Sequence, residues 1–231
     1  MLLQVGHPSV AAGVASYSAF RDDPFGRLER TLSAMLAISF GSPERREEVL
    51  SGLRSVHREV KGNRSDGERY RALDPDLQMW VWATLVDTAL RVERRYQHRL
   101  STHEREQYYA ESTELARAFR VPDSMIPESL RSFDDYIAET IASLVVTEDA
   151  RAVCREIMRP AMWWAPRPVW VPIEWVTIDL LPVSLRRDYG FASLGRAERL
   201  ALRQVRRVSR AVLPLLPEPL LINPFARQSI A

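Results

Sequence analysis

The chain has 231 residues, of which 46% are hydrophobic and 27% charged, a composition typical of ordinary globular proteins that excludes disordered and fibrous ones. Lys and Arg number 32 against 30 for Asp and Glu, so the net charge of +2 gives no strong attraction to nucleic acid or to anionic membranes. The single cysteine, Cys154, excludes an internal disulfide, and no residues have the spacing of a structural zinc site.

No clear break in composition divides the chain, which predicts a single domain over residues 1–231. Residues 1–14 lack the basic segment and the long apolar run of a secretory signal. We therefore expect a cytoplasmic protein with no transmembrane segment.

Helix-start signals and helical spacing of apolar residues recur along nearly the whole chain, which has only nine glycines. Asp23, Ser42 and Asp74 each precede a proline, a typical helix start, and Ser101 with Glu104 forms a capping box. The pattern predicts an all-α fold, a single-domain helical bundle. Helices are expected over residues 24–40, 43–61, 76–98, 101–119, 127–144, 147–158 and 193–213, with a polar loop over 63–68.

The composition shifts once, over residues 160–183, where five prolines and four of the six tryptophans fall. The prolines exclude a membrane-spanning helix. The segment could form a lid, a weak contact with a membrane surface, or a hydrophobic layer covering the core, and we favour the covering layer. Residues 214–231, which prolines interrupt, are expected to form an irregular tail.

His57 differs from the other histidines in its position. It follows Leu53 by four residues in the expected helix over 43–61, so it borders the apolar stripe of that helix. An imidazole at the edge of a buried face must be hydrogen-bonded or ligated, because a buried unpaired ring nitrogen is costly. Two interpretations stay open: a core histidine bonded to a neighbouring carbonyl, or a metal or haem ligand.

Arg27, Arg30 and Thr31 form a second polar group, on the expected helix over 24–40. Their spacing places them on one face of that helix. Two guanidinium groups and a hydroxyl could bind propionates, a carboxylate substrate or a polarised oxygen atom. The alternative is a solvated face with salt bridges to Asp22 or Glu29. The stripe of this helix that we expect in the core consists of Leu28, Leu32, Met35 and Leu36.

His7 and Pro8 precede a run of small residues over 9–20. Small side chains permit tight packing against another helix or a flat cofactor, and His7 itself is expected at a helix terminus. His98 and His103 flank a helix junction among charged residues and are expected to face water.

Other chemical motifs are absent from the sequence. Asp87 and Glu93 stand as lone carboxylates among apolar neighbours, and no His, Asp and Glu pairing has di-iron spacing. No phosphate-binding loop, dinucleotide fingerprint or nucleophilic serine motif occurs. A short helix-turn-helix unit with a basic recognition helix is also missing, so we expect no nucleic acid partner.

Short segments in a fixed order nevertheless carry a resemblance that spans most of the chain. They read LLQVGHPSVAAGVASYSAF, DPFGRLERT, RSVHREVKG, YRALDPDLQMWVWATLVDTAL, REQYYAE, VP and LLPVSLRRDYG. In these segments the chain resembles a bacterial family of mostly uncharacterised proteins. That family shares a domain with latex clearing protein, a rubber oxygenase, and with the endoplasmic-reticulum-bound oxygenase of mycophenolic acid biosynthesis.

The resemblance implies an all-helical fold with a globin-like core and a haem b held by one histidine. It implies that His57 is the iron ligand and that Arg54, one turn earlier, pairs with a propionate. Arg27, Arg30 and Thr31 match the Arg-x-x-Lys-Thr cluster of rubber oxygenase, with Arg30 in place of the lysine. A guanidinium stays protonated and is a poor iron ligand, so Arg30 is not expected to reach the iron.

We therefore expect a haem b-dependent oxygenase that uses dioxygen to oxidise an apolar small molecule. His57 would ligate the iron, Arg27 and Arg30 would hold propionates or stabilise bound dioxygen, and Thr31 would donate a hydrogen bond. The alternative is a haem-free ligand-binding or protein-interaction protein of the same fold. In that alternative His57 is a core residue and the tryptophans form a partner surface.

Overall fold

The computed structural model describes residues 1–17, 24–97, 99–158 and 167–217. Its helices are α1 (Pro8–Tyr17), α2 (Pro24–Phe40), α3 (Pro43–Glu59), α4 (Pro75–Tyr96), α5 (Thr102–Ala118), α6 (Leu130–Ser143), α7 (Glu148–Met158), α8 (Arg167–Leu180), α9 (Val183–Asp188) and α10 (Arg196–Val212). Two short strands, β1 (Lys61–Asn63) and β2 (Arg69–Arg71), and single 3-10 turns at Gln4–Gly6, Asp123–Met125 and Leu213–Leu215 lie between or beside them. The expected all-α fold is confirmed. None of the helices in these ranges combines the length and the apolar character needed to cross a bilayer.

The helices that begin at strong capping signals lie where the sequence predicts them. Ser42 Oγ accepts a hydrogen bond from the backbone N–H of Arg45 at 3.3 Å, which caps α3. Ser101 and Glu104 form the predicted capping box of α5. α4 begins at Pro75 directly after Asp74, whose side chain makes no cap bond to the helix. Serine caps therefore mark the starts of α3 and α5, and the proline at the first helical position marks that of α4.

Two predicted helix starts are wrong by about three residues. α6 begins at Leu130 and not at 127, because Ser129 and Ser132 form a reciprocal cap there. α10 begins at Arg196 after Gly195 and not at Ser193. In both cases the chain stays extended past the residue from which the helix was expected to begin.

A β-hairpin flanks the loop that was predicted over 63–68. The strands pair antiparallel, with Lys61 opposite Arg71. Gly67 takes a φ of +87° in the connecting turn, a conformation that favours glycine. Strands of three residues are too short to give an alternating pattern, so the sequence could not predict them.

The segment over 160–183 is helical where the structure describes it. Trp163 and Trp164 lie outside the described residues, but α8 runs from Arg167 with Pro172 inside it. The prolines of this segment excluded only a membrane-spanning helix, and α8 is a short helix that contains Pro172, which lacks the N–H of one helical hydrogen bond. Trp170 Nε1 donates a 3.0 Å hydrogen bond to the Met158 carbonyl, which holds α8 against the end of α7.

The core is centred on α4. Trp80 and Trp82 are 1% and 0% exposed, and the Trp82 ring meets Phe133 of α6 edge-on at 5.6 Å between centroids. Both indole N–H groups are satisfied, Trp80 by the Gln4 carbonyl at 3.0 Å and Trp82 by the Ser112 carbonyl at 2.9 Å. Burial of each large apolar side chain contributes about 1.5–3 kcal/mol, so α4 fixes the helices around it.

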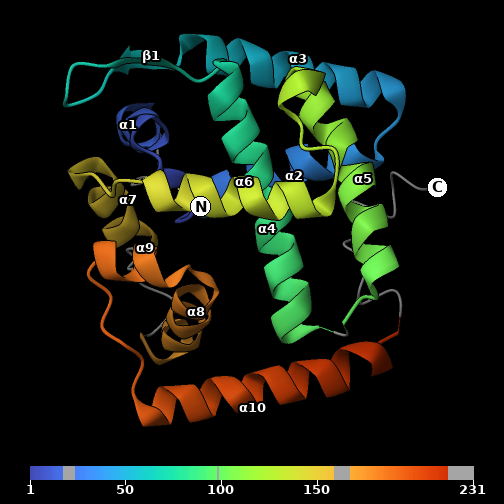
Figure 1. The fold of residues 1–231 in the computed structure, drawn as a ribbon, viewed down its shortest axis with the longest axis vertical. Coiled ribbons are helices and arrows are strands. Elements are labelled where there is room, and N and C mark those ends of the chain that lie inside the picture. The colour runs from blue at the N-terminus through green and yellow to red at the C-terminus, as the bar shows by residue number, and fades with distance from the viewer. Residues whose placement is uncertain (18–23, 98, 159–166, 218–231) are drawn as a thin grey trace.

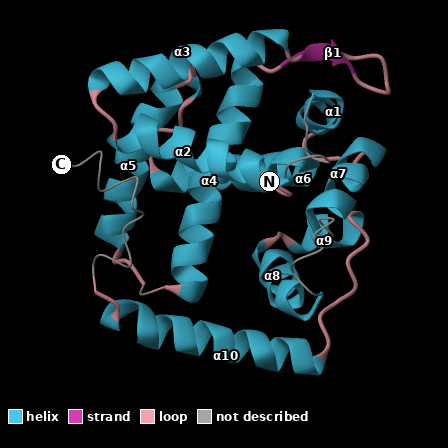
Figure 2. Cartoon of the chain, turned by 180° about the vertical axis from the view of Figure 1, so that it is seen from behind, coloured by secondary structure: helices cyan, strands magenta, loops and turns pink. Residues whose placement is uncertain are grey.

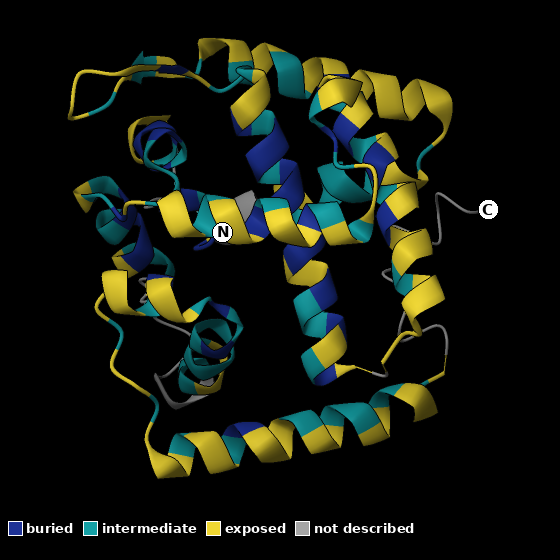
Figure 3. Ribbon diagram, viewed as in Figure 1, coloured by how far each residue is buried: buried dark blue, intermediate teal, exposed yellow. Residues whose placement is uncertain are grey.

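The arrangement of the helices places two surfaces at opposite ends of the molecule. α4 runs through the middle, α3 lies across one end and α10 across the other (Figure 1). The reverse view agrees, with α8 and α9 on the side of α10 (Figure 2). Buried residues are concentrated on α4, whereas α3 and α10 are mostly exposed or partly buried (Figure 3). A site on α3 and a site on α10 would therefore be separate.

The small residues of α1 permit close packing on its neighbours. Ala11, Ala12 and Gly13 are buried, and α1 packs against α7 and β1. A Cβ atom at Gly13 would lie 3.4 Å from both Tyr70 and Val60. The expectation that this segment packs tightly against another helix is confirmed.

Candidate functional site

The predicted site residues lie on α2 and α3, which pack against each other. A short turn joins the two helices, and Gly41 is required in it because a Cβ atom there would be 2.4 Å from the Ala37 carbonyl oxygen. Arg46 Nε of α3 donates a 2.6 Å hydrogen bond to the Ile38 carbonyl of α2. Ile38 is only 1% exposed, so the two helices are held firmly at this end.

His57 is partly buried in the last turn of α3. Its ring nitrogens make no hydrogen bond to any residue in the described ranges, so the neighbouring-carbonyl bond of a core histidine is not found there. Burial lowers the pKa of His57 below its ordinary value of 6.5. At neutral pH the imidazole is therefore neutral and offers a lone pair, which is what an iron ligand must provide.

Arg54, one turn before His57, already has an anionic partner. Its Nη2 atom forms an ion pair with Glu47 Oε1. The Arg54 side chain is 23% exposed and that of Glu47 is 67% exposed. A pair with so much solvent contact is weak, so a propionate could displace Glu47.

The predicted cluster on α2 is exposed where it is described. Arg30 and Thr31 lie on the exposed surface of the helix, while the side chain of Arg27 lies outside what the structure describes. α2 and α3 thus bring the predicted residues onto one pair of packed helices. A direct contact between this cluster and His57 stays a prediction.

The expected core stripe of α2 is only partly buried. Leu32 is 49% exposed, so the prediction is wrong for that residue, while Met35 and Leu36 are partly buried. Phe40 and Val56 are 47% and 64% exposed on the same helix pair. Val56 places exposed apolar surface next to His57, which makes no ring hydrogen bond to any described residue, whereas Phe40 lies at the other end of the pair, beside the α2–α3 turn.

The remaining predicted polar residues serve the fold. His7 is at the helix terminus, as expected: its Nδ1 atom accepts a 3.2 Å hydrogen bond from the Ser9 N–H and so caps α1. His103 is exposed, as expected, whereas His98 lies outside the described residues. The two carboxylates that stand alone in the sequence both accept hydrogen bonds. Asp87 accepts one from Arg91 Nε at 2.6 Å, and Glu93 accepts one from the Leu100 N–H at 2.6 Å.

Asp179 of α8 is the centre of a buried polar network near the other end of the molecule. It is 8% exposed, and its Oδ2 atom accepts hydrogen bonds from the Tyr96 hydroxyl at 2.8 Å and from Arg206 Nη2 at 2.5 Å. Arg95 Nη1 lies 3.3 Å from the same oxygen. Burial alone would raise the pKa of Asp179, but the bonds from Tyr96 and Arg206 outweigh it and hold the pKa below its ordinary value.

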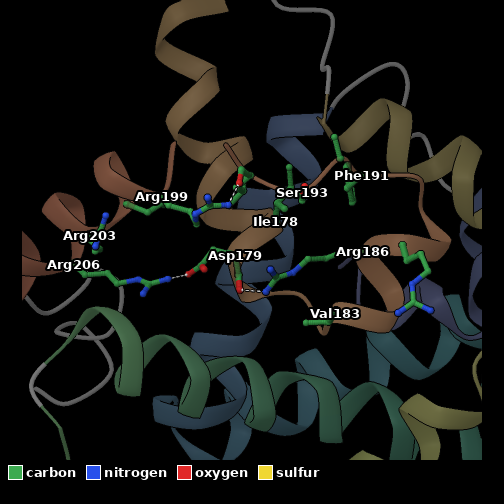
Figure 4. Close-up of a pocket in the computed structure, with 13 residues that line it drawn as sticks. Ile178, Asp179, Val183, Arg186, Phe191, Ser193, Arg199, Arg203 and Arg206 are labelled. Atoms are coloured by element: carbon green, nitrogen blue, oxygen red, sulfur yellow. Dashed lines mark hydrogen bonds and ion pairs between the residues drawn. The ribbon is translucent and has the colours of Figure 1, made fainter. Parts of the chain in front are cut away.

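A cavity of about 620 Å³ lies beside Asp179, between α8, α9 and α10 (Figure 4). Its lining includes no histidine among the described residues. Besides Asp179, its charged lining residues are Arg186, Arg187, Arg199, Arg203 and Arg206. The cavity is thus distinct from the α2–α3 pair.

Comparison with known proteins identifies the family. Residues 1–211 match the family described as "ER-bound oxygenase mpaB/B'/Rubber oxygenase, catalytic domain". The chain belongs to this oxygenase family. The resemblance drawn from the sequence segments is thereby confirmed, and an oxygenase acting on a small molecule is supported at that general level.

Two mycobacterial proteins are similar to this chain over most of its length. "Uncharacterized protein Mb2261" of Mycobacterium bovis and "Uncharacterized protein Rv2237" of Mycobacterium tuberculosis are each 25% identical to this chain over 180 residues. Each match covers 75% of this chain and 70% of the relative. No solved structure matches the chain.

The cavity and the Asp179 network were missed by the sequence analysis, which placed no site on this part of the oxygenase-family chain. One signal was present in the sequence of α10, which carries six arginines separated by one, three or four residues. They stand at positions 196, 199, 203, 206, 207 and 210. Nothing local in the sequence links them to Asp179 or Tyr96, because those contacts join residues far apart in the chain.

Proposed function

We propose that this protein is a haem b-dependent oxygenase that uses dioxygen to oxidise an apolar small molecule, with His57 as the residue that would hold the iron. Its membership of an oxygenase catalytic-domain family supports the reaction class. The observation that carries the cofactor assignment is His57, a partly buried imidazole whose ring nitrogens have no hydrogen-bond partner in the described part of the chain.

The donor chemistry of the α2–α3 pair fits a haem b. One neutral imidazole is enough for axial ligation of a haem, so the site does not depend on a cluster of protein ligands. Groups of three or more His, Cys, Asp or Glu side chains suited to a metal ion do not occur among the described residues. Val56, next to His57, is 64% exposed, and a flat apolar cofactor would cover it.

The arginines of the pair would orient the cofactor through its propionates. Arg54 would exchange its exposed partner Glu47 for a propionate, since an Arg–carboxylate pair is bidentate and gains strength when shielded from water. Arg27 and Arg30 would bind the second propionate or the oxygen side of the site, and Thr31 would donate a hydrogen bond there. A bound haem b supplies the iron centre that activates dioxygen.

Apolar surface on the same helices supports an apolar substrate. Leu32, which directly follows Thr31 of the predicted cluster, and Val56, next to His57, are 49% and 64% exposed, which is high for large side chains beside a predicted site. They would bind hydrocarbon and exclude water from the reacting atoms. The single domain and the cytoplasmic location predicted from the sequence remain part of this proposal.

The test compares His57→Ala with His103→Ala, a change at an exposed histidine of α5. Both variants are expressed with a haem precursor, and helical content is checked by circular dichroism. We expect His57→Ala to lose the Soret band while keeping its helical signal, and His103→Ala to keep both. Added imidazole should restore a Soret band to His57→Ala, because it replaces the missing ligand.

Two results would contradict the proposal. One is a His57→Ala protein with an unchanged haem spectrum, which would assign the ligand elsewhere. The other is a wild-type protein that folds without haem and is merely destabilised by His57→Ala. That second result would favour the haem-free binding protein, in which the tryptophans were expected to form the partner surface. Trp80 and Trp82 are buried, so among the described residues the partly buried Trp170 and Trp175 would have to supply that surface.

A further inference from the structure

The cavity between α8, α9 and α10 has an unusual charge balance. Five arginines and one carboxylate line it among the residues that the structure describes, which gives these residues an excess of four positive charges. Like charges this close repel one another in the partly buried environment of a cavity. An anion bound among them would relieve the repulsion.

Asp179 cannot neutralise the other arginines of the cavity. Its carboxylate is already bound by the Tyr96 hydroxyl, by Arg206 Nη2 at 2.5 Å and by Arg95 Nη1 at 3.3 Å. Figure 4 shows Arg206 and Arg186 approaching Asp179 from opposite sides, and Arg186 reaches only its backbone. The positive charge of Arg186 therefore lacks a carboxylate.

Arg186 is held in place with donors to spare. Its Nη2 atom donates to the Asp179 carbonyl at 2.7 Å and its Nε atom to the Leu181 carbonyl at 2.8 Å. These bonds fix the guanidinium plane and leave the Nη1 group for another acceptor. Burial, and then the nearby charges of Arg95 and Arg206, lower the pKa of Arg186, although Asp179 opposes the shift.

Two arginines of α10, Arg199 and Arg203, line the cavity together with Arg186 and form what we call its cationic wall. Arg199 donates one bond, from Nη1 to the Leu194 carbonyl, and extends toward the loop that carries Ser193 (Figure 4). The side chain of Arg203 makes no hydrogen bond or ion pair with any residue in the described ranges. Both guanidinium groups thus keep most of their donors for a ligand.

Apart from Ser193, the other described residues of the wall are apolar. Ile178, Val183, Phe191 and Leu202 line the same cavity. A hydrated inorganic ion would gain nothing from these side chains, whereas a hydrocarbon chain would bury surface against them.

We propose that this cavity binds an amphipathic organic anion, with its carboxylate or phosphate group on Arg186, Arg199 and Arg203 and its alkyl body on the apolar wall. Guanidinium forks bind both oxyanions in a bidentate manner, and about 620 Å³ is ample for a short acyl chain. The site is separate from the α2–α3 pair and stands whether or not His57 binds haem.

Calorimetric titration of the full chain with octanoate and with octyl phosphate tests the proposal. Inorganic phosphate and 1-octanol serve as the charged and the apolar fragments. We expect octanoate or octyl phosphate to bind one site per chain and to bind more tightly than either fragment. Preference between the two amphiphiles then distinguishes a carboxylate ligand from a phosphate ligand.

The matched variants are Arg199→Gln/Arg203→Gln and Arg196→Gln/Arg207→Gln. Each removes two charges from exposed positions of α10, but only the first pair lines the cavity. We expect the first double variant to bind about tenfold or more weakly and the second to bind like the wild type, because only the first loses charge-assisted hydrogen bonds. Arg203→Gln alone, which removes no bond of the described structure, serves if the first pair folds poorly.

Several results would overturn the proposal. Equal loss of binding in both double variants would mean attraction to the net charge of α10 and not a site. Binding of 1-octanol as tight as that of octanoate would show that the arginines contribute nothing to affinity. Binding of inorganic phosphate as tight as that of octyl phosphate would show the same for the apolar wall. Sedimentation with vesicles of phosphatidylglycerol and phosphatidylcholine, without binding of the free anions, would assign the arginines to a membrane surface.

Discussion

Tyr96 donates its hydroxyl to Asp179 Oδ2 at 2.8 Å, across 83 positions of the sequence. Tyr96 is the last residue of α4, so this bond ties the central helix to α8. The Ser209 hydroxyl donates to the Tyr96 carbonyl at 2.6 Å, which adds α10 to the same junction. The cationic cavity thus borders a buried polar contact, and residues 191–194 of the loop between α9 and α10 line it as well.

Tyr96→Phe tests the energetic weight of this junction. The change keeps the ring and removes the hydroxyl, so Asp179 retains Arg206 and loses one charge-assisted bond. We expect the free energy of unfolding in urea to fall by about 1–2 kcal/mol. Tyr108→Phe is the control, because Tyr108 is 37% exposed and should change stability by less than about 0.5 kcal/mol. Equal effects of the two changes would mean that the Tyr96 bond contributes nothing.

Alanine at two glycines of the α2–α3 pair should change the stability of the protein in opposite directions. Gly41→Ala brings a methyl group to 2.4 Å from the Ala37 carbonyl oxygen, so the turn must shift, at a cost of about 1–3 kcal/mol. Gly52, in the middle of α3, has no atom within 4 Å of an added Cβ, and Gly52→Ala should stabilise by about 0.5–1 kcal/mol. Thermal unfolding of the two variants measures both. A Gly41→Ala protein as stable as Gly52→Ala would refute the close approach at this turn.

His7 predicts a dependence of stability on pH. Burial, and then the charge of Arg64, lower its pKa below the ordinary value of 6.5, so the folded state binds fewer protons than the unfolded state. Stability is therefore full above pH 6.5 and declines as the pH falls from 6.5 toward the folded pKa. His57, whose pKa burial also lowers, contributes in the same direction.

His7→Asn separates the two contributions. Asparagine still caps α1 by accepting the Ser9 N–H, but it does not titrate. We expect urea unfolding between pH 7 and 5 to show a smaller loss of stability in His7→Asn than in the wild type. His103→Asn, at an exposed position, should leave the wild-type slope unchanged. An identical slope in His7→Asn and wild type would refute the role of His7.

Local chemistry made most of the fold predictable. α2, α3, α4 and α5 begin at or next to their predicted residues because each start is marked by a proline at the first helical position or by a serine cap, both of which are local signals in the sequence. α10 begins later than expected because its N-cap residue is Gly195, although glycine is a weaker cap than the Ser193 that was predicted to fill this role. Pro172 concealed α8, since the packing that tolerates an interior proline is not visible in the sequence.

The candidate site was predictable only as a set of residue types. The spacing of Leu53 and His57 predicted a histidine at the edge of an apolar face, and His57 is indeed partly buried. The exposure of Leu32 was not predictable, because the period of a helix says which residues share a face but not what covers that face. The Asp179 network depends on contacts between α4, α8 and α10, which no local pattern encodes.

Haem content tests the central claim most directly. An absorption spectrum of the wild-type protein, expressed with a haem precursor, is followed by a pyridine haemochrome assay on the same sample. The account predicts a Soret band and about one haem b per chain. A colourless, fully helical protein that also fails to take up added hemin would contradict it.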